Sequence, residues 1–173
     1  MTTTDELPDE MFLVEIENEQ GNSQQTLSFS RSPTVALSFA ANRFTRAAAR
    51  VYQSSFGVGA MDWRMLVMLT RAPGSSVATA SRTIGIDKGA VSRSLGRLEK
   101  EGLATAECNT PDERRKDWTL TPKGQALHDD ILSVALQRQK KLLKGFSPQE
   151  VRAFNDYLQR FLVNLDELNK EES

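Results

Sequence analysis

Hydrophobic side chains return every three or four positions in several separate stretches of this chain. The longest stretches cover residues 34–56, 122–143 and 148–168, and shorter ones cover 77–84 and 88–100. Residues 61–69 are apolar around most of the helical circumference, as in a helix buried between others. Glycine and proline separate these stretches, so the pattern predicts a mostly α-helical protein.

The first 33 residues do not follow this pattern, and we interpret residues 1–33 as an extension. Residues 11–14 are a short apolar run that can dock on the rest of the protein, whereas residues 19–25 have the composition of a loop. Ser32 and Pro33 then supply a cap and a first helical residue.

The stretch over 88–100 combines an apolar face with a cationic one. The inward positions are Val91, Leu95 and Leu98, and the other face carries Lys88, Gly89, Ala90, Ser92, Arg93 and Arg97. Asp87 can cap its first turn and Gly102 can end its last one. A short helix with cations, hydroxyls and nearly bare backbone at its start suits the major groove of DNA, although an ordinary amphipathic helix has the same pattern.

The neighbouring segments favour the DNA-binding interpretation. A short helix over 77–84, capped by Ser76, precedes a turn at Gly85, which gives a helix-turn-helix in which Ser81 is available for phosphates or for solvent. Two strands over 103–108 and 116–120 then enclose a turn-rich tip, as in a β-hairpin wing. Arg114 at this tip can enter a narrow minor groove, or form a loop ion pair with Asp112.

Charge is distributed unevenly along the chain. Residues 1–30 have a net charge of −7, residues 31–123 have +7, and residues 124–173 have −1. A basic middle segment is typical of a polyanion-binding domain. The acidic extension is a solvated face or a competitor of DNA for that basic surface.

Other classes of protein find little support in the composition. No apolar run approaches the roughly 18 residues of a membrane span, and the acidic N-terminus is unlike a signal peptide. The single cysteine, Cys108, excludes an internal disulfide and fits a reducing cytoplasm, where we expect the protein. With one histidine, no glycine-rich phosphate loop and no cluster of metal ligands, we expect neither an enzyme, nor a cofactor, nor a metal site.

Several motifs over 63–124 resemble the MarR (multiple antibiotic resistance regulator) family. They are Leu98-Glu99-Lys100-Glu101-Gly102-Leu103, the pair Asp112 and Arg114, and Leu120-Thr121 followed by Gly124. The resemblance implies a winged helix-turn-helix at 59–121 and symmetric dimers joined by helices at 34–58 and 122–173. From the residues alone, the apolar seam from Val151 to Leu168 suits a partner helix in this chain or in another.

The expected DNA interface combines the recognition helix, its bracing helix and the wing. Its residues are Ser76, Ser81, Lys88, Gly89, Ala90, Ser92, Arg93, Arg97, Asp112, Arg114, Arg115 and Lys116. Two departures from the family matter: Ala106 stands where the family often has arginine, and Gly89-Ala90 where it often has serine or threonine. Because Gly89 and Ala90 donate no side-chain hydrogen bonds, direct readout depends on Lys88, Ser92 and Arg93.

The resemblance also implies a pocket for a small aromatic or phenolic anion. Phe39, Arg43, Arg46, Trp63 and His128 can contribute to it. Each has a plainer alternative: core packing for the aromatic residues, solvent or phosphate for the arginines, and an exposed helix surface for His128. Cys108 lies beside the cationic wing in the sequence, which makes it a candidate oxidation sensor.

Together these features predict a homodimeric regulator that binds a palindromic operator and is a repressor released by a small ligand. The alternative is a dimeric winged-helix adaptor without specific DNA binding, which the Gly89-Ala90 start and the acidic extension favour.

Overall fold

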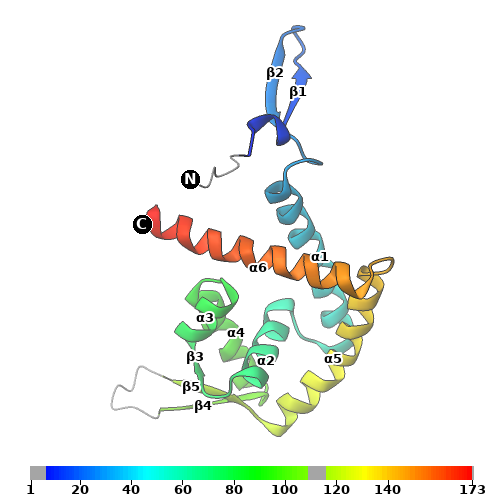
Figure 1. Cartoon of the computed structure of the whole chain (residues 1–173). Coiled ribbons are helices and arrows are strands. Elements are labelled where there is room, and N and C mark those ends of the chain that lie inside the picture. Colours follow the sequence, from blue (N-terminus) through cyan, green and yellow to red (C-terminus); the bar gives the residue numbers. More distant parts are fainter. Residues whose placement is uncertain (1–6, 109–115, 173) are drawn as a thin grey trace. The chain divides into compact units, whose positions relative to one another are not determined.

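The computed structural model of the protein describes residues 7–108 and 116–172. These residues belong to two compact units, one that ends at Gln125 and one that begins at Ala126. Helices predominate in both units, and the mostly α fold with a small β-wing is confirmed (Figure 1). Within the described residues, no helix has both the length and the apolar character that a membrane crossing requires.

The first unit contains the helix-turn-helix and a three-stranded antiparallel sheet. Its helices are α1 (Pro33–Phe56), α2 (Ala60–Arg71), α3 (Val77–Ile84) and α4 (Lys88–Lys100), and its small sheet consists of β3 (Ser75–Ser76), β4 (Ala104–Glu107) and β5 (Asp117–Leu120). The strands lie in the order β3-β5-β4, with Ala104 opposite Leu120 and Ser75 opposite Trp118. The predicted wing strands are therefore confirmed, whereas the short strand β3 was not predicted.

Side-chain caps start the two helices of the helix-turn-helix, as the sequence predicts. The Ser76 hydroxyl accepts a hydrogen bond from the Thr79 N–H at 3.2 Å, and the Asp87 carboxylate accepts one from the Ala90 N–H at 2.8 Å. Between the two helices Gly85 has φ +65°, a left-handed conformation that glycine adopts without strain. The turn is thereby fixed at both of its ends.

The core of this unit lies between α2 and α4. Met65, Leu66 and Leu69 on α2 are at most 1% exposed, as are the predicted inward residues Val91, Leu95 and Leu98 on α4. Burial of a leucine-sized side chain contributes about 1.5–3 kcal/mol. One face of α4 is thus held by α2, and the opposite face is left to solvent.

The segment Leu120-Thr121-Pro122-Lys123-Gly124 fastens the start of α5 to the end of α4. The Thr121 hydroxyl donates to the Gly102 carbonyl at 2.7 Å and accepts from the Gly124 N–H at 3.1 Å. Lys123 Nζ donates to the Glu101 carbonyl at 2.8 Å. A Cβ on Gly124 would lie 1.9 Å from the Leu103 carbonyl oxygen, so this position requires glycine.

A β-hairpin precedes α1, and here the sequence interpretation was partly wrong. Strands β1 (Leu13–Glu17) and β2 (Ser23–Leu27) follow a short 3-10 helix, η1 (Asp9–Met11). Residues 23–25, expected to be loop, lie in β2. Asn18 Oδ1 accepts from the Gln20 and Asn22 N–H groups and shapes the turn, and both strands have exposed faces that hide the alternation of a half-buried strand.

The second unit comprises most of α5 (Pro122–Leu142) and all of α6 (Pro148–Glu171). The predicted capping box at the start of α6 is confirmed, since Ser147 and Glu150 exchange hydrogen bonds of 3.2 Å and 2.7 Å. Hydrogen bonds from the backbone N–H and then from the hydroxyl of Ser147 lower the pKa of Glu150 below its ordinary 4.5. This exchange fixes the first turn of α6.

Candidate nucleic-acid interface

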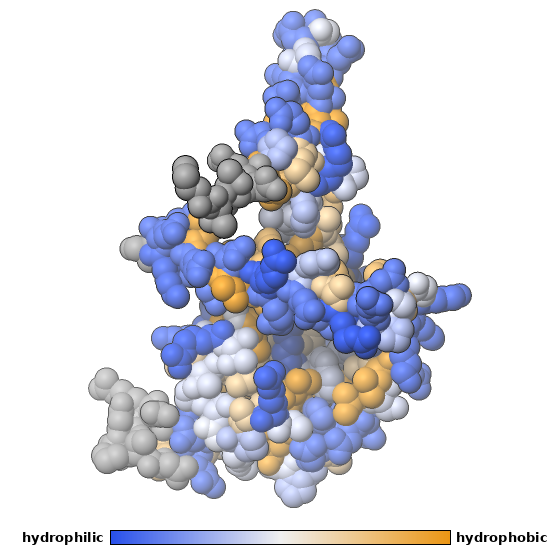
Figure 2. Space-filling view, viewed as in Figure 1, coloured by the Kyte–Doolittle hydropathy of each residue, from blue (hydrophilic) through white to orange (hydrophobic). Residues whose placement is uncertain are grey.

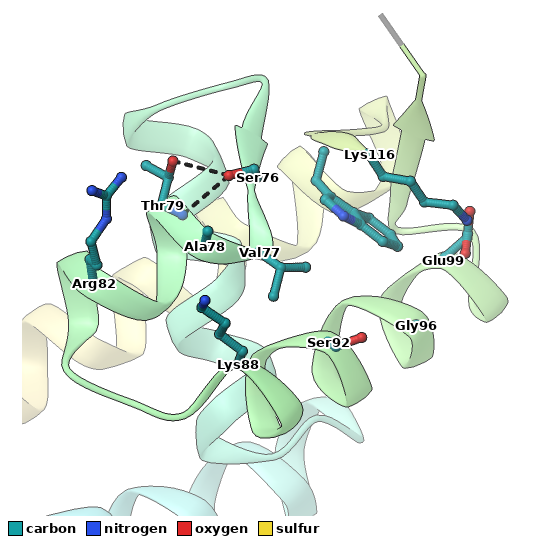
Figure 3. A pocket seen from close by; sticks show the side chains of 11 residues that line it. Ser76, Val77, Ala78, Thr79, Arg82, Lys88, Ser92, Gly96, Glu99 and Lys116 are labelled. Atoms are coloured by element: carbon teal, nitrogen blue, oxygen red, sulfur yellow. Dashed lines mark hydrogen bonds between the residues drawn. The ribbon is translucent and has the colours of Figure 1, made fainter. Parts of the chain in front are cut away.

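The exposed face of α4 borders a groove of about 660 Å³ between α3, α4 and the base of the wing. Arg82 on α3, Lys88 on α4 and Lys116 beside β5 supply its cations, and Glu99 supplies its one carboxylate among the described lining residues. Figure 3 shows Lys88, Ser92 and Gly96 following one another along α4 on the side of this groove. The groove is therefore positively charged along the helix that the sequence assigned to DNA.

In the first turn of α4, side-chain atoms of Asp87 and Arg93 both lie close to the Gly89 backbone. A Cβ on Gly89 would lie 3.2 Å from Arg93 Nη1 and 3.1 Å from Asp87 Oδ1. Both distances are tighter than ordinary carbon contacts, so a larger residue would push the guanidinium or the cap aside. Gly89 thus provides the space in which Arg93 lies back over the helix start.

Arg97 lies on a different side of α4 from the groove and is bound to α2. Its Nη2 is 2.6 Å from Asp62 Oδ1, which also accepts the Ser94 hydroxyl at 2.5 Å. The other oxygen of Asp62 accepts the Gly59 N–H at 3.2 Å. Half of the Arg97 side chain remains exposed, yet its position is set by the buried Asp62 carboxylate rather than by solvent.

Two hydroxyls predicted to face DNA, Ser76 at the cap of α3 and Ser81 within it, both make hydrogen bonds inside the protein. Ser76 lies at the groove but its hydroxyl is 3.1 Å from that of Thr79 (Figure 3). Ser81 donates to the Ile86 carbonyl at 2.6 Å and so closes the turn of the helix-turn-helix. Arg82 on the same helix is exposed and lines the groove.

Three comparisons agree with this geometry. A model of the MarR family matches residues 56–115, which include α2, α3, α4 and β4. A MarR/EmrR family regulator from Acinetobacter sp. ADP1 is 28% identical with a TM-score of 0.76, over 82% of this chain and 99% of that one. The HTH-type transcriptional regulator PetP of Rhodobacter capsulatus is 26% identical over 127 residues, 73% of this chain and 76% of that protein.

The chain is similar to the MarR family over residues 56–115 and shares the fold of its members. The proteins that it matches are transcriptional regulators, and this chain has their winged-helix fold. The fold is also that of MepR from S. aureus, solved as a DNA complex, which is 18% identical with a TM-score of 0.68 over 80% of this chain and 99% of that one.

The structure describes the base of the wing, which consists of β4, Lys116 and β5. Lys116 Nζ lies 5.8 Å from the centroid of the buried Trp118 ring, which places an ammonium at the rim of the groove. The predicted wing residues Asp112, Arg114 and Arg115 lie outside the described residues. Their assignment to DNA stays a prediction from the sequence.

Four of the five residues expected to bind a small ligand belong to the first unit, where they line two different grooves. Phe39, Arg43 and Arg46 line one groove on α1, with a volume of about 570 Å³. Trp63 lines another, of about 290 Å³, between α2 and α3, and its ring packs on Tyr52 at 5.7 Å. His128 is buried rather than exposed on its helix, and its Nδ1 is 2.8 Å from Asp129 Oδ1 in the second unit.

Two residues with clear structural roles were not predicted. Asp62 links three partners that are up to 35 residues away, so its role depends on tertiary structure. Its sequence signal was an acid three residues after Gly59, the usual position of a capping carboxylate. Trp118 was placed on a strand, but its position in the wall of the groove follows only from the pairing of β3 with β5.

Proposed function

We propose that this protein is a homodimeric, sequence-specific repressor that binds a palindromic operator. The observation that carries the proposal is the orientation of α4. Its apolar residues are buried against α2, while Lys88, Ser92 and Arg93 are exposed beside a cationic groove. An α-helix presented in this way fits the major groove, with its first turns at the base edges.

Exposed apolar side chains on α6 support the dimer. Phe154, Tyr157 and Leu168 are 47%, 64% and 47% exposed in the single chain. An apolar helical face of this kind indicates a protein partner. A two-fold axis through such a helix would present two recognition helices to half-sites about one helical turn apart.

We also propose that a small aromatic anion lowers the affinity for the operator. The groove on α1 offers an aromatic ring, Phe39, and two guanidinium groups, Arg43 and Arg46. Such a set suits an aromatic carboxylate or phenolate. The ligand changes operator affinity only by as much as it distinguishes the DNA-binding form from the other form.

The adaptor alternative loses part of its support. Its main argument was that Gly89 and Ala90 are poor readers of DNA. Gly89 leaves space that the Arg93 guanidinium occupies, so glycine at this position is compatible with a cation presented by the recognition helix.

Operator titrations of Arg93→Ala test the proposal. We expect the variant to weaken specific binding by about 1–3 kcal/mol and to relax specificity at one base pair of each half-site. Lys100→Ala is the matched control, because Lys100 is an exposed cation at the other end of the same helix. Arg114→Ala, in the wing, should weaken specific and non-specific binding together. Unchanged titrations for both arginine variants would contradict the assignment of these residues to DNA.

A further inference from the structure

An arginine stripe runs along α1 without local counter-charges. Arg43, Arg46 and Arg50 are all exposed and recur three and four residues apart, so they share one face of the helix. Helix α1 contains no aspartate or glutamate. Within residues 7–108 and 116–172 no ion pair to any of these three arginines is present. Phe39 and Asn42 complete the groove of about 570 Å³ beside them.

The N-terminal hairpin has the opposite charge. Glu15 and Glu17 are exposed on one face of β1, Glu19 lies at the turn, and residues 7–30 contain no lysine or arginine. Ile16 and Leu27 on the strands are 47% and 49% exposed. Figure 2 shows a mostly hydrophilic surface over this hairpin, interrupted by small hydrophobic areas.

The hairpin is held together by strand pairing and by side-chain hydrogen bonds. All five residues of β1 pair with β2, the Ser23 hydroxyl donates to Glu15 at 2.5 Å, and Arg31 Nη2 donates to the Leu13 carbonyl. A two-stranded hairpin alone is marginally stable in water, so a partner for its exposed side chains is expected. The connection through residues 28–32 leads directly into α1.

The two surfaces match in spacing as well as in charge. Carboxylates two residues apart on a strand are separated by about 6.7 Å along the chain, and arginines three or four apart on a helix by about 5–6 Å. Each carboxylate–guanidinium pair can form two parallel hydrogen bonds, so matched spacing stabilises a contact between the two surfaces. Exposed apolar residues accompany the charges on both sides: Leu27, which pairs with Leu13 on the Glu15 and Glu17 face of the hairpin, and Phe39 on the helix.

We propose that the acidic hairpin of one copy of this chain docks on the Arg43–Arg46–Arg50 stripe of a second copy. The contact extends the dimer and rests on the proposed homodimer. The two-fold axis generates it twice, because each copy supplies one hairpin and one stripe. A small aromatic anion bound at Arg43 and Arg46 would compete with the hairpin for the same guanidinium groups.

Charge reversal in two separate variants tests the contact. One variant carries Glu15→Lys and Glu17→Lys, and the other carries Arg46→Glu and Arg50→Glu. Each homodimer then opposes like charges, so we expect its dissociation constant to rise about tenfold at physiological salt. In an equimolar mixture of the two variants, a hairpin faces a stripe of opposite charge only in the heterodimer. Native mass spectrometry should therefore find that heterodimers make up well over half of the dimers, which is the fraction that random pairing gives.

The controls separate this contact from general charge effects and from the function itself. Asp9→Lys with Glu10→Lys makes the same charge change in η1, outside β1, and should leave the dissociation constant and the statistical mixture unchanged. A statistical mixture of the two charge-reversed variants would overturn the proposal, including the case in which the hairpin folds onto its own α1. Wild-type protein that is monomeric or does not bind its operator would instead contradict the proposed function.

Discussion

Gly124 shows how a single missing methyl group positions the recognition helix. The Leu103 carbonyl oxygen occupies the space that a Cβ would need, and this approach lets the Thr121 hydroxyl reach the Gly102 carbonyl. The end of α4 and the start of α5 are therefore joined through backbone atoms. The family motif that contains Leu120, Thr121 and Gly124 has a physical reason in this close contact.

Gly124→Ala should destabilise the first unit strongly. A methyl group 1.9 Å from a carbonyl oxygen forces the backbone apart, which we expect to cost about 2–4 kcal/mol. Urea denaturation measures the loss. Gly96→Ala is the control, because its added methyl meets nothing within 4 Å and alanine favours a helix interior by about 1 kcal/mol. Equal stabilities of the two variants would contradict the close approach.

Asp62 and Arg97 should behave as a structural pair. The carboxylate is 11% exposed and holds both Ser94 and Arg97 of α4. We expect Asp62→Asn to cost about 1–3 kcal/mol of stability, at the lower end because Arg97 is half exposed. A double-mutant cycle with Arg97→Ala, measured by chemical denaturation, should show coupling between the two sites. Additive effects, together with a loss of operator affinity in Arg97→Ala alone, would favour a direct DNA contact instead.

At the scale of elements, the capping box of α6 makes one helix start sensitive to acid. Glu150 has a lowered pKa, so its contribution is complete above its ordinary pKa of 4.5 and is lost as the pH falls through the lower folded value. Ser147→Ala should cost about 1 kcal/mol at neutral pH. Glu150→Gln should remove the acid sensitivity of the first-turn amides of α6 in hydrogen exchange. Acid sensitivity that persists in this variant would point to another group.

Helices with one buried face could be predicted from the sequence to within a residue or two. The spacing of Val91, Leu95 and Leu98 and the cap at Asp87 gave α4 its bounds, because a helix buried on one side leaves a period of 3.6. The hairpin at 13–27 was missed because most of its strand residues are exposed, which leaves no alternation of buried and exposed positions. Strand β3 was missed because two residues are too short for any period.

The candidate site was predictable along α4 and much less so elsewhere. Lys88 and Ser92 are four residues apart and therefore share one face of α4, so both could be assigned to the groove from spacing alone. The ligand residues come from separate helices, and spacing within a helix does not say which grooves they line. Phe39 and Trp63 consequently line different grooves.

At the scale of the whole molecule, cations around the groove predict a strong dependence of binding on salt. Arg82 is exposed at the groove, and we expect it to contact a phosphate rather than a base. Arg82→Ala should weaken binding to all duplexes alike and reduce the slope of log K against log salt by about one per subunit. Titrations at several salt concentrations, with operator and with random DNA, measure both effects. A change confined to the operator would mean that Arg82 reads sequence.

The segregation of charge has a practical consequence for handling the protein. The first 30 residues carry seven of its 23 carboxylates and none of its 22 lysines and arginines, so cleavage after Ser30 changes the formal charge of each chain from −1 to +6. The isoelectric point would move from the acidic to the basic side. A preparation that has been clipped in this segment should leave an anion-exchange column and bind a cation exchanger. Chromatography alone would thus reveal whether a sample still possesses its hairpin.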